Sequence, residues 1–200
     1  QSRIVANLTR AFEVAGLQLP RRPWLDDLAS VVDLNDLPNE GDTRIPMARV
    51  DVPEQQVQQA AVFVPDRDGS LVVYGTSGSG KSTLLKTIAT AAGMRPDHGP
   101  VQVYCLDFAS GALGALTALP HVGSVVDSND PERIQRLLRT LDAEMDRRSA
   151  AFSAASASSV QEYRELADPK MPRILLLIDN YPDFKKEWEI TQGRGAFYRV

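Results

Sequence analysis

The chain has 200 residues, 43% of them hydrophobic, which suits one globular domain with a lead-in segment. Its formal net charge of −4 and its pI of about 5.2 argue against a dedicated nucleic-acid-binding module, because such modules usually carry a basic stripe. The single cysteine, Cys105, excludes a disulfide framework and fits a reducing cytoplasm. No apolar run approaches the roughly 18 residues of a membrane span, so we expect this segment to be soluble.

The first part of the chain predicts a lead-in without a core of its own. Residues 2–16 carry apolar side chains at helical spacing and end in Gly16, which predicts one helix. Residues 17–56 are rich in proline and acidic residues and predict an irregular path. The chain begins at Gln1 without a methionine, so we expect it to be cut from a longer protein.

Alternating strands and helices are predicted from residue 57 onward. The pattern predicts strands over 57–64, 71–74, 101–106, 122–126 and 173–179. It predicts helices over 81–93 and 111–118. Two further helices are predicted to begin at Pro131, with Asp130 as the N-cap, and at residue 160. The Ala/Ser-rich stretch 150–159 predicts a loop or a frayed helix end. Residues 173–179 are apolar without alternation, which is typical of a parallel strand buried on both faces.

The strongest motif is the glycine-rich stretch Gly75–Ser82, which matches the phosphate-binding pattern G-x-x-x-x-G-K-[ST] between a predicted strand and a predicted helix. Lys81 would reach the β- and γ-phosphates of ATP or GTP, and the Ser82 hydroxyl would ligate Mg²⁺. The alternative is a Gly/Ser-rich turn with a stray lysine. The residues expected to contact the nucleotide are Gly75, Thr76, Ser77, Gly78, Ser79, Gly80, Lys81, Ser82, Thr83 and Asp179.

This motif and the strand pattern together predict an α/β P-loop NTPase with a mostly parallel sheet flanked by helices. Asp179 at the end of the last apolar strand is the Walker B candidate, holding the Mg²⁺ shell opposite Ser82. The alternative is an acidic residue that merely ends a buried strand. Only residues 180–200 follow Asp179, so we expect the C-terminal part of the sheet to be missing from the chain.

Asn180 occupies the position where hydrolysing enzymes of this broad class often carry a glutamate. An amide can hydrogen-bond the attacking water but cannot accept its proton, and losing one general base costs on the order of 10²–10⁴ in rate. No other residue stands out as catalytic, since Asp183 is expected to lie on the solvated surface. We therefore predict a module that binds Mg-ATP and hydrolyses it slowly or not at all.

Several other residues are weaker candidates. Asp107 ends the strand predicted beside the P-loop strand, and could face the phosphates or only solvent. His121 follows Pro120 and is expected to be a packing or turn residue. The arginines of the long helix, Arg133, Arg136 and Arg139, are expected to form a solvated face.

Two stretches also carry a family resemblance. Residues 73–87 resemble the P-loop strand and helix of FtsK/SpoIIIE-type ATPases, whose fold is RecA/FtsK-like. Residues 103–111 (VYCLDFASG), with 119–123 (LPHVG) and 130–133 (DPER), resemble the EccC-type ATPase of type VII (ESX) secretion systems. The resemblance covers roughly residues 45–190.

The resemblance implies properties that the residues alone do not show. EccC-type proteins are membrane-anchored motors with several ATPase modules in tandem, and they export WXG100-class proteins that carry a C-terminal signal. Later modules are often degenerate, which fits Asn180. Residues 1–45 would then be a lead-in helix and inter-module linker, and residues 46–200 the ATPase module on the cytoplasmic side of the membrane.

The partners implied are the other modules of the same motor and an exported protein or its signal peptide. Two alternatives remain open at this point. An active FtsK-type DNA translocase would bind duplex DNA in a salt-sensitive way, although the acidic pI and Asn180 count against DNA. A structural module with a vestigial P-loop would bind no ATP.

Overall fold

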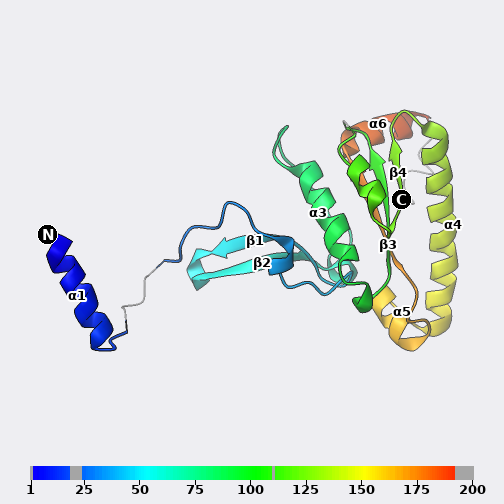
Figure 1. The fold of residues 1–200 in the computed structure, drawn as a ribbon. Coiled ribbons are helices and arrows are strands. Elements are labelled where there is room, and N and C mark those ends of the chain that lie inside the picture. Colours follow the sequence, from blue (N-terminus) through cyan, green and yellow to red (C-terminus); the bar gives the residue numbers. More distant parts are fainter. Residues whose placement is uncertain (1, 19–23, 110, 192–200) are drawn as a thin grey trace. The chain divides into compact units, whose positions relative to one another are not determined.

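The computed structural model describes residues 2–18, 24–109 and 111–191 (Figure 1). The chain forms two compact units, one from residues 1–30 with 50–59 and the other from residues 31–49 with 60–200. None of the helices within the described ranges is both long and apolar enough to cross a membrane.

The smaller unit contains the predicted lead-in helix, α1 (Ser2–Val14). Gly16 ends it with a φ of 62°, and the Leu17 N–H donates back to the Phe12 carbonyl, as in a glycine-terminated helix. In the same unit the Gln58 side chain donates to the Asp26 carbonyl at 2.9 Å. The helix prediction is confirmed.

Two strands before the P-loop form a sheet of their own, β1 (Ile45–Val52) and β2 (Val57–Phe63). The second was predicted, but β1 lies inside the stretch 17–56 for which an irregular path was expected. Both strands of a two-stranded sheet are edge strands, and an edge strand tolerates a proline on its unpaired side, where no N–H is needed for a hydrogen bond. Pro46 therefore does not prevent the pairing. Ile45 and Phe63, which belong to the larger unit, are buried in its core.

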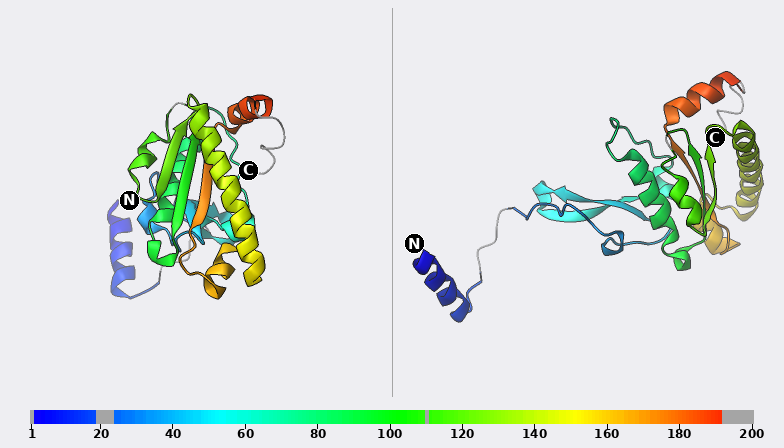
Figure 2. Two further views of the ribbon diagram at one scale, coloured as in Figure 1. Left: turned by 90° about the vertical axis from the view of Figure 1, so that its right-hand side faces the viewer. Right: turned by 45° about the horizontal axis from the view of Figure 1, so that its top comes forward.

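The larger unit is built on a parallel sheet whose strands have the order β4-β3-β5, confirming the predicted strands at 101, 122 and 173. These strands are β3 (Val101–Asp107), β4 (Val122–Asp127) and β5 (Arg173–Asp179). Figure 2 shows them side by side. In this register Asp107 lies opposite Asp127 on one side and Asp179 on the other, so all three strands end in aspartate at one edge.

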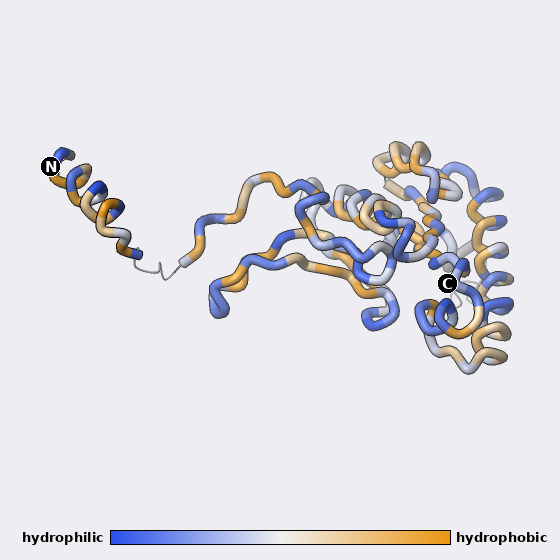
Figure 3. The backbone as a smooth tube through the Cα atoms, turned by 60° about the horizontal axis from the view of Figure 1, so that its bottom comes forward, coloured by the Kyte–Doolittle hydropathy of each residue, from blue (hydrophilic) through white to orange (hydrophobic). Residues whose placement is uncertain are grey.

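Helices cover both faces of this sheet (Figure 1). On one face α3 (Lys81–Gly93) packs against Val103, Cys105 and Leu177, and on the other α4 (Pro131–Ala155) and α6 (Tyr181–Thr191) pack against Leu106 and Val126. Hydrophobic and hydrophilic residues alternate along α4, as expected for a helix that buries one face (Figure 3). The remaining short elements are α2 (Pro65–Asp68), α5 (Val160–Leu166) and the 3-10 helices Leu34–Asp36, Pro53–Gln55, Pro96–His98 and Gly114–Ala118.

Three local predictions were wrong or incomplete. Residues 71–74 form no strand, and Tyr74 is 90% exposed, because no hydrogen-bonded neighbour strand lies beside them among the described residues. The helix predicted over 111–118 is a single 3-10 segment, Gly114–Ala118. Helix α4 continues to Ala155 through the expected loop, since alanine is a strong helix former, and Ser156 ends it with a φ of 55°.

A buried ion-pair network supports the start of β5, and the sequence did not indicate it. The fully buried Asp42 accepts hydrogen bonds from Arg164 at 2.9 and 3.0 Å and from Arg173 at 2.9 Å. Arg173 also donates to Asp66 at 2.7 and 2.9 Å, and these hydrogen bonds hold the pKa of Asp66 below its usual value. Two carboxylates thus balance two guanidinium groups, as buried charges require.

Candidate nucleotide-binding site

The glycine-rich loop lies directly before α3 and leaves the start of this helix uncapped by any side chain. Gly78 and Gly80 have φ values of 75° and 91°, a conformation that glycine adopts without strain. The first backbone N–H groups of α3 therefore remain available, and the helix dipole makes their surroundings favourable for an anion.

The Ser79 side chain lies close to the first glycine of the loop. A Cβ atom on Gly75 would lie 2.4 Å from the Ser79 hydroxyl oxygen, far inside van der Waals contact. The loop is closed by a hydrogen bond from the Ser79 N–H to the Thr76 carbonyl at 3.3 Å. Thr76, Ser77 and Ser79 are all exposed, so the loop presents its surface to solvent.

Lys81 folds back over this loop. Its ammonium group donates to the carbonyl oxygens of Gly75 at 3.0 Å and Thr76 at 2.7 Å. These carbonyls hold the cation at the loop, where an anion bound by the helix N-terminus would meet it. Thr83 is exposed on the first turn of α3, with its carbonyl accepting from the Thr87 hydroxyl at 3.1 Å.

Ser82 and Asp179 are brought together although they are 97 residues apart in the chain. The Ser82 hydroxyl donates to a carboxylate oxygen of Asp179 at 2.5 Å, and Asp179 is only 4% exposed. A hydroxyl and a buried carboxylate side by side are the hard oxygen ligands that Mg²⁺ prefers. The predicted pairing of the motif with the end of β5 is therefore present in the structure.

Asn180 is held by two neighbours and has a φ of 59°. Its Nδ2 donates to the carbonyl oxygen of Phe108 at 3.0 Å and also to the carboxylate of Asp183. A side-chain amide has two N–H donors, so both are engaged and only Oδ1 is left to face a ligand. That oxygen accepts hydrogen bonds but takes no proton, which agrees with the absence of a general base at this position.

Asp107 was expected to face either the phosphates or solvent, and the structure gives it a different role. It is buried, and its carboxylate accepts from the backbone N–H groups of Ala109 at 3.1 Å and Leu113 at 2.9 Å. The side chain therefore closes the loop that follows β3. His121 packs as predicted, with its Nε2 at 2.9 Å from the Ala89 carbonyl oxygen.

Sequence reasoning missed the contribution of Phe108 and Asp183. Phe108 lies next to the site through its backbone, since its N–H donates to the Asp179 carbonyl at 3.2 Å. Its ring packs edge-to-face on Phe184 of α6, with the ring centroids 5.3 Å apart. No local signal marks the contacts of Phe108, because they depend on the register between β3 and β5. Asp183 contacts Asn180 only three residues away, at the start of α6.

Known proteins match most of this chain. A model of the FtsK/SpoIIIE family matches residues 36–181. The ESX-1 secretion system protein EccCb1 of Mycobacterium tuberculosis is 31% identical over 183 residues, which are 86% of this chain and 31% of that protein. This chain thus spans about a third of that relative's length.

Solved structures give the same result. The cytoplasmic domain of the type VII secretion ATPase EccC of Thermomonospora curvata matches with a TM-score of 0.75 and 27% identity, over 86% of this chain and 23% of that one. A second structure contains ATPases 2 and 3 of the same organism's EccC in complex with a signal sequence peptide. It matches with a TM-score of 0.66 and 30% identity, over 75% of this chain and 28% of that one.

Proposed function

The chain belongs to the FtsK/SpoIIIE family, and on that premise we propose that it is the ATP-binding module of a type VII protein secretion motor that hydrolyses ATP slowly or not at all. One observation carries the proposal. The P-loop places Ser82 against Asp179, as nucleotide binding requires, while the next residue, Asn180, offers an amide whose donors are already engaged.

The residues of the site fit a Mg-nucleotide. The loop from Gly75 to Gly80, Lys81 and the uncapped start of α3 with Thr83 would hold the phosphates, and Ser82 and Asp179 would hold the Mg²⁺ ion. A bound Mg²⁺ ion would neutralise phosphate charge. The chain's own contribution is binding and orientation, because the residue directly after Asp179 is Asn180, whose amide cannot take a proton from water.

The relatives support a role within a larger motor. They include type VII secretion proteins, and one matching structure is described as ATPases 2 and 3 with a signal sequence peptide. We propose that residues 46–200 form one ATPase module, with residues 1–45 as the lead-in helix and linker. The module would act on the cytoplasmic face of a membrane-anchored motor, contact neighbouring modules and dock the exported WXG100-class protein through its signal.

Binding and turnover of Mg-ATP test this function. We expect a fluorescent ATP analogue to bind the wild-type protein and to bind Lys81→Ala at least about tenfold more weakly, since a direct charge contact to phosphate is lost. Lys86→Ala, one turn further along α3, is the matched control and should bind like wild type. Phosphate release should match between wild type and Lys81→Ala.

Two results would overturn the proposal. Absence of nucleotide binding at millimolar concentration would favour a vestigial P-loop. Rapid turnover that Lys81→Ala abolishes would favour an active motor module, and salt-sensitive duplex DNA binding by that active protein would favour a DNA translocase.

A further inference from the structure

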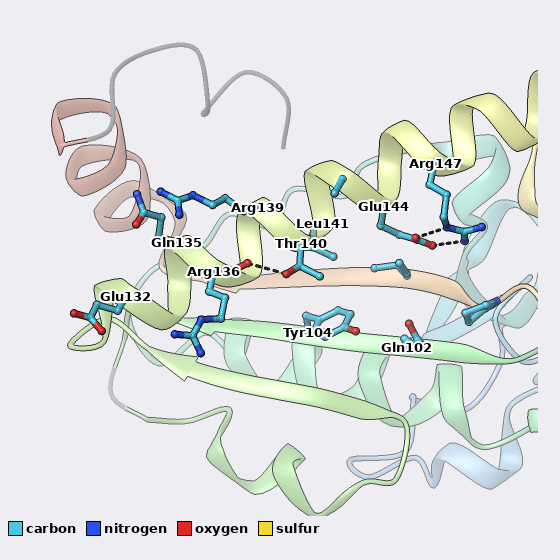
Figure 4. Close-up of a pocket in the computed structure, with 13 residues that line it drawn as sticks. Gln102, Tyr104, Glu132, Gln135, Arg136, Arg139, Thr140, Leu141, Glu144 and Arg147 are labelled. Atoms are coloured by element: carbon cyan, nitrogen blue, oxygen red, sulfur yellow. Dashed lines mark hydrogen bonds and ion pairs between the residues drawn. The ribbon is translucent and has the colours of Figure 1, made fainter.

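A second concave surface lies on the face of the sheet opposite the P-loop. Along β3, Val103 and Cys105 pack toward α3, so Tyr104 between them points to the other face, toward α4. A groove of about 1070 Å³ runs there between α4, β3 and the beginning of β5 (Figure 4). None of its lining residues belongs to the nucleotide site.

The floor of the groove is apolar and is formed by Tyr104 and Ile174, with Leu141 on the helix side. Gly123 on β4 makes room for the tyrosine, since a Cβ atom there would lie 2.6 Å from the Tyr104 ring. The ring therefore lies close against β4, and the residue as a whole is half-buried in the lining of the groove.

The arginines of α4 divide into two kinds. Arg133 pairs with Asp130 at 3.2 Å, while Arg147 and Arg148 each pair with Glu144 at 2.7 Å. Arg136 and Arg139 both line the groove, and within the described ranges neither guanidinium group has an ion pair or a hydrogen bond. Figure 4 shows Arg136 reaching from α4 toward the strands and Arg139 on the neighbouring flank of the helix.

Two uncharged donors also belong to the groove. The side chains of Gln102 and Tyr104 also line the groove and have no hydrogen-bond partner in the described part of the chain. Glu132 is the one lining acid without an ion pair among the described residues, and it lies at the end of the groove nearest the start of α4 (Figure 4). The groove as a whole therefore offers guanidinium, amide and hydroxyl donors beside apolar side chains, which suits carboxylates carried on a partly apolar ligand.

We propose that this groove is a docking site for an acidic peptide segment of a partner protein, with carboxylates on Arg136 and Arg139 and an apolar side chain on Tyr104 and Ile174. The net charge of −4 over the whole chain disfavours a nucleic acid as the occupant. This groove would be the place where the module docks a partner protein, and in that respect the proposal rests on the proposed function. Binding of the acidic peptide to this groove requires no bound nucleotide.

Fluorescence anisotropy tests the docking site with two labelled twelve-residue peptides, one alternating pairs of glutamate and leucine and the other with lysine in place of every glutamate. We expect saturable binding of the glutamate peptide only. Arg136→Glu and Arg139→Glu should each weaken it about tenfold, because a guanidinium group that attracts the peptide carboxylates is replaced by a carboxylate that repels them. Arg133→Glu, on the same helix but outside the groove, is the matched control and should change the Kd less than twofold.

The proposal would be overturned by the absence of saturable binding of the glutamate peptide, by equal binding of the lysine peptide, or by tighter binding of a single-stranded DNA oligonucleotide. Binding that Arg136→Glu and Arg139→Glu leave unchanged would overturn it as well, and circular dichroism would establish that these variants are folded. Peptide binding should persist in Lys81→Ala. A protein that binds the peptide but no ATP would therefore refute the proposed function and leave the docking site standing.

Discussion

The side chain of Asn180 donates to the backbone carbonyl of Phe108 at 3.0 Å, and in doing so ties the residue after β5 to the loop after β3. The same amide nitrogen donates to Asp183 in the first turn of α6, and the Asp183 N–H returns a bond to the Asn180 carbonyl at 3.1 Å. Position 180 is therefore a structural junction as well as the position at which a general base is absent. A glutamate carboxylate at this position has no N–H group, so it could donate a hydrogen bond neither to the carbonyl of Phe108 nor to the carboxylate of Asp183.

This junction predicts that restoring the base needs two changes. We expect Asn180→Glu alone to gain little ATPase activity, because Asp183 would repel the new carboxylate. Asn180→Glu with Asp183→Asn restores a donor beside it and should gain about 10²-fold in phosphate release, the lower end of what one general base contributes. Asp183→Asn alone and Asn180→Glu with Lys81→Ala are the controls, and a full gain from Asn180→Glu alone would contradict the prediction.

The buried network around Asp42 should be essential for stability. Asp42→Asn removes the carboxylate that accepts from both Arg164 and Arg173 and leaves buried cationic charge uncompensated, which costs about 3–5 kcal/mol. Urea unfolding measures this change in the free energy of unfolding. Asp97→Asn is the matched control, since its ion pair with Arg95 is exposed to solvent and should change the free energy of unfolding far less. Equal losses for the two variants would contradict the assignment.

Gly99 should tolerate no side chain because of the same network. Its φ is 149°, and a Cβ atom there would lie 2.2 Å from the Arg164 guanidinium and 2.7 Å from an Asp42 carboxylate oxygen. We expect Gly99→Ala to lower the free energy of unfolding by at least about 2 kcal/mol, from backbone strain and displaced ion pairs together. Gly114→Ala, where a Cβ atom would meet nothing within 4 Å, should lie within about 0.5 kcal/mol of wild type in the same thermal or urea unfolding experiment.

Glu144 should make stability depend on acid pH. Hydrogen bonds from Arg147, and with them those from Arg148, lower its pKa from 4.5 to about 2. A carboxylate whose pKa is lower in the folded state stabilises the fold above its unfolded pKa, and this contribution is lost as the pH falls from about 4.5 to about 2. The difference in Tm between wild type and Glu144→Gln should therefore be largest above pH 4.5 and shrink toward pH 2. A difference that stays constant over that range would refute this role.

Contiguous residues by themselves determined much of this protein. The P-loop motif at Gly75–Ser82, the Asp130 cap of α4 and the apolar run that forms β5 are local signals, because each depends on neighbours along the chain. The acidic end of that run predicted which aspartate would meet the loop, and the structure places Ser82 against it at 2.5 Å.

Contacts between distant residues were decided only by the tertiary structure. The ion pair of Asp42 with Arg164 joins residues 122 positions apart, and no periodicity marks such a pair. Residues 71–74 carry an apolar pattern but form no strand, since a strand exists only through hydrogen bonds to a neighbour. The hydrogen bond from Asn180 to Phe108 and the presence of Arg136 and Tyr104 in one groove likewise depend on strand register and helix packing, which a linear pattern does not contain.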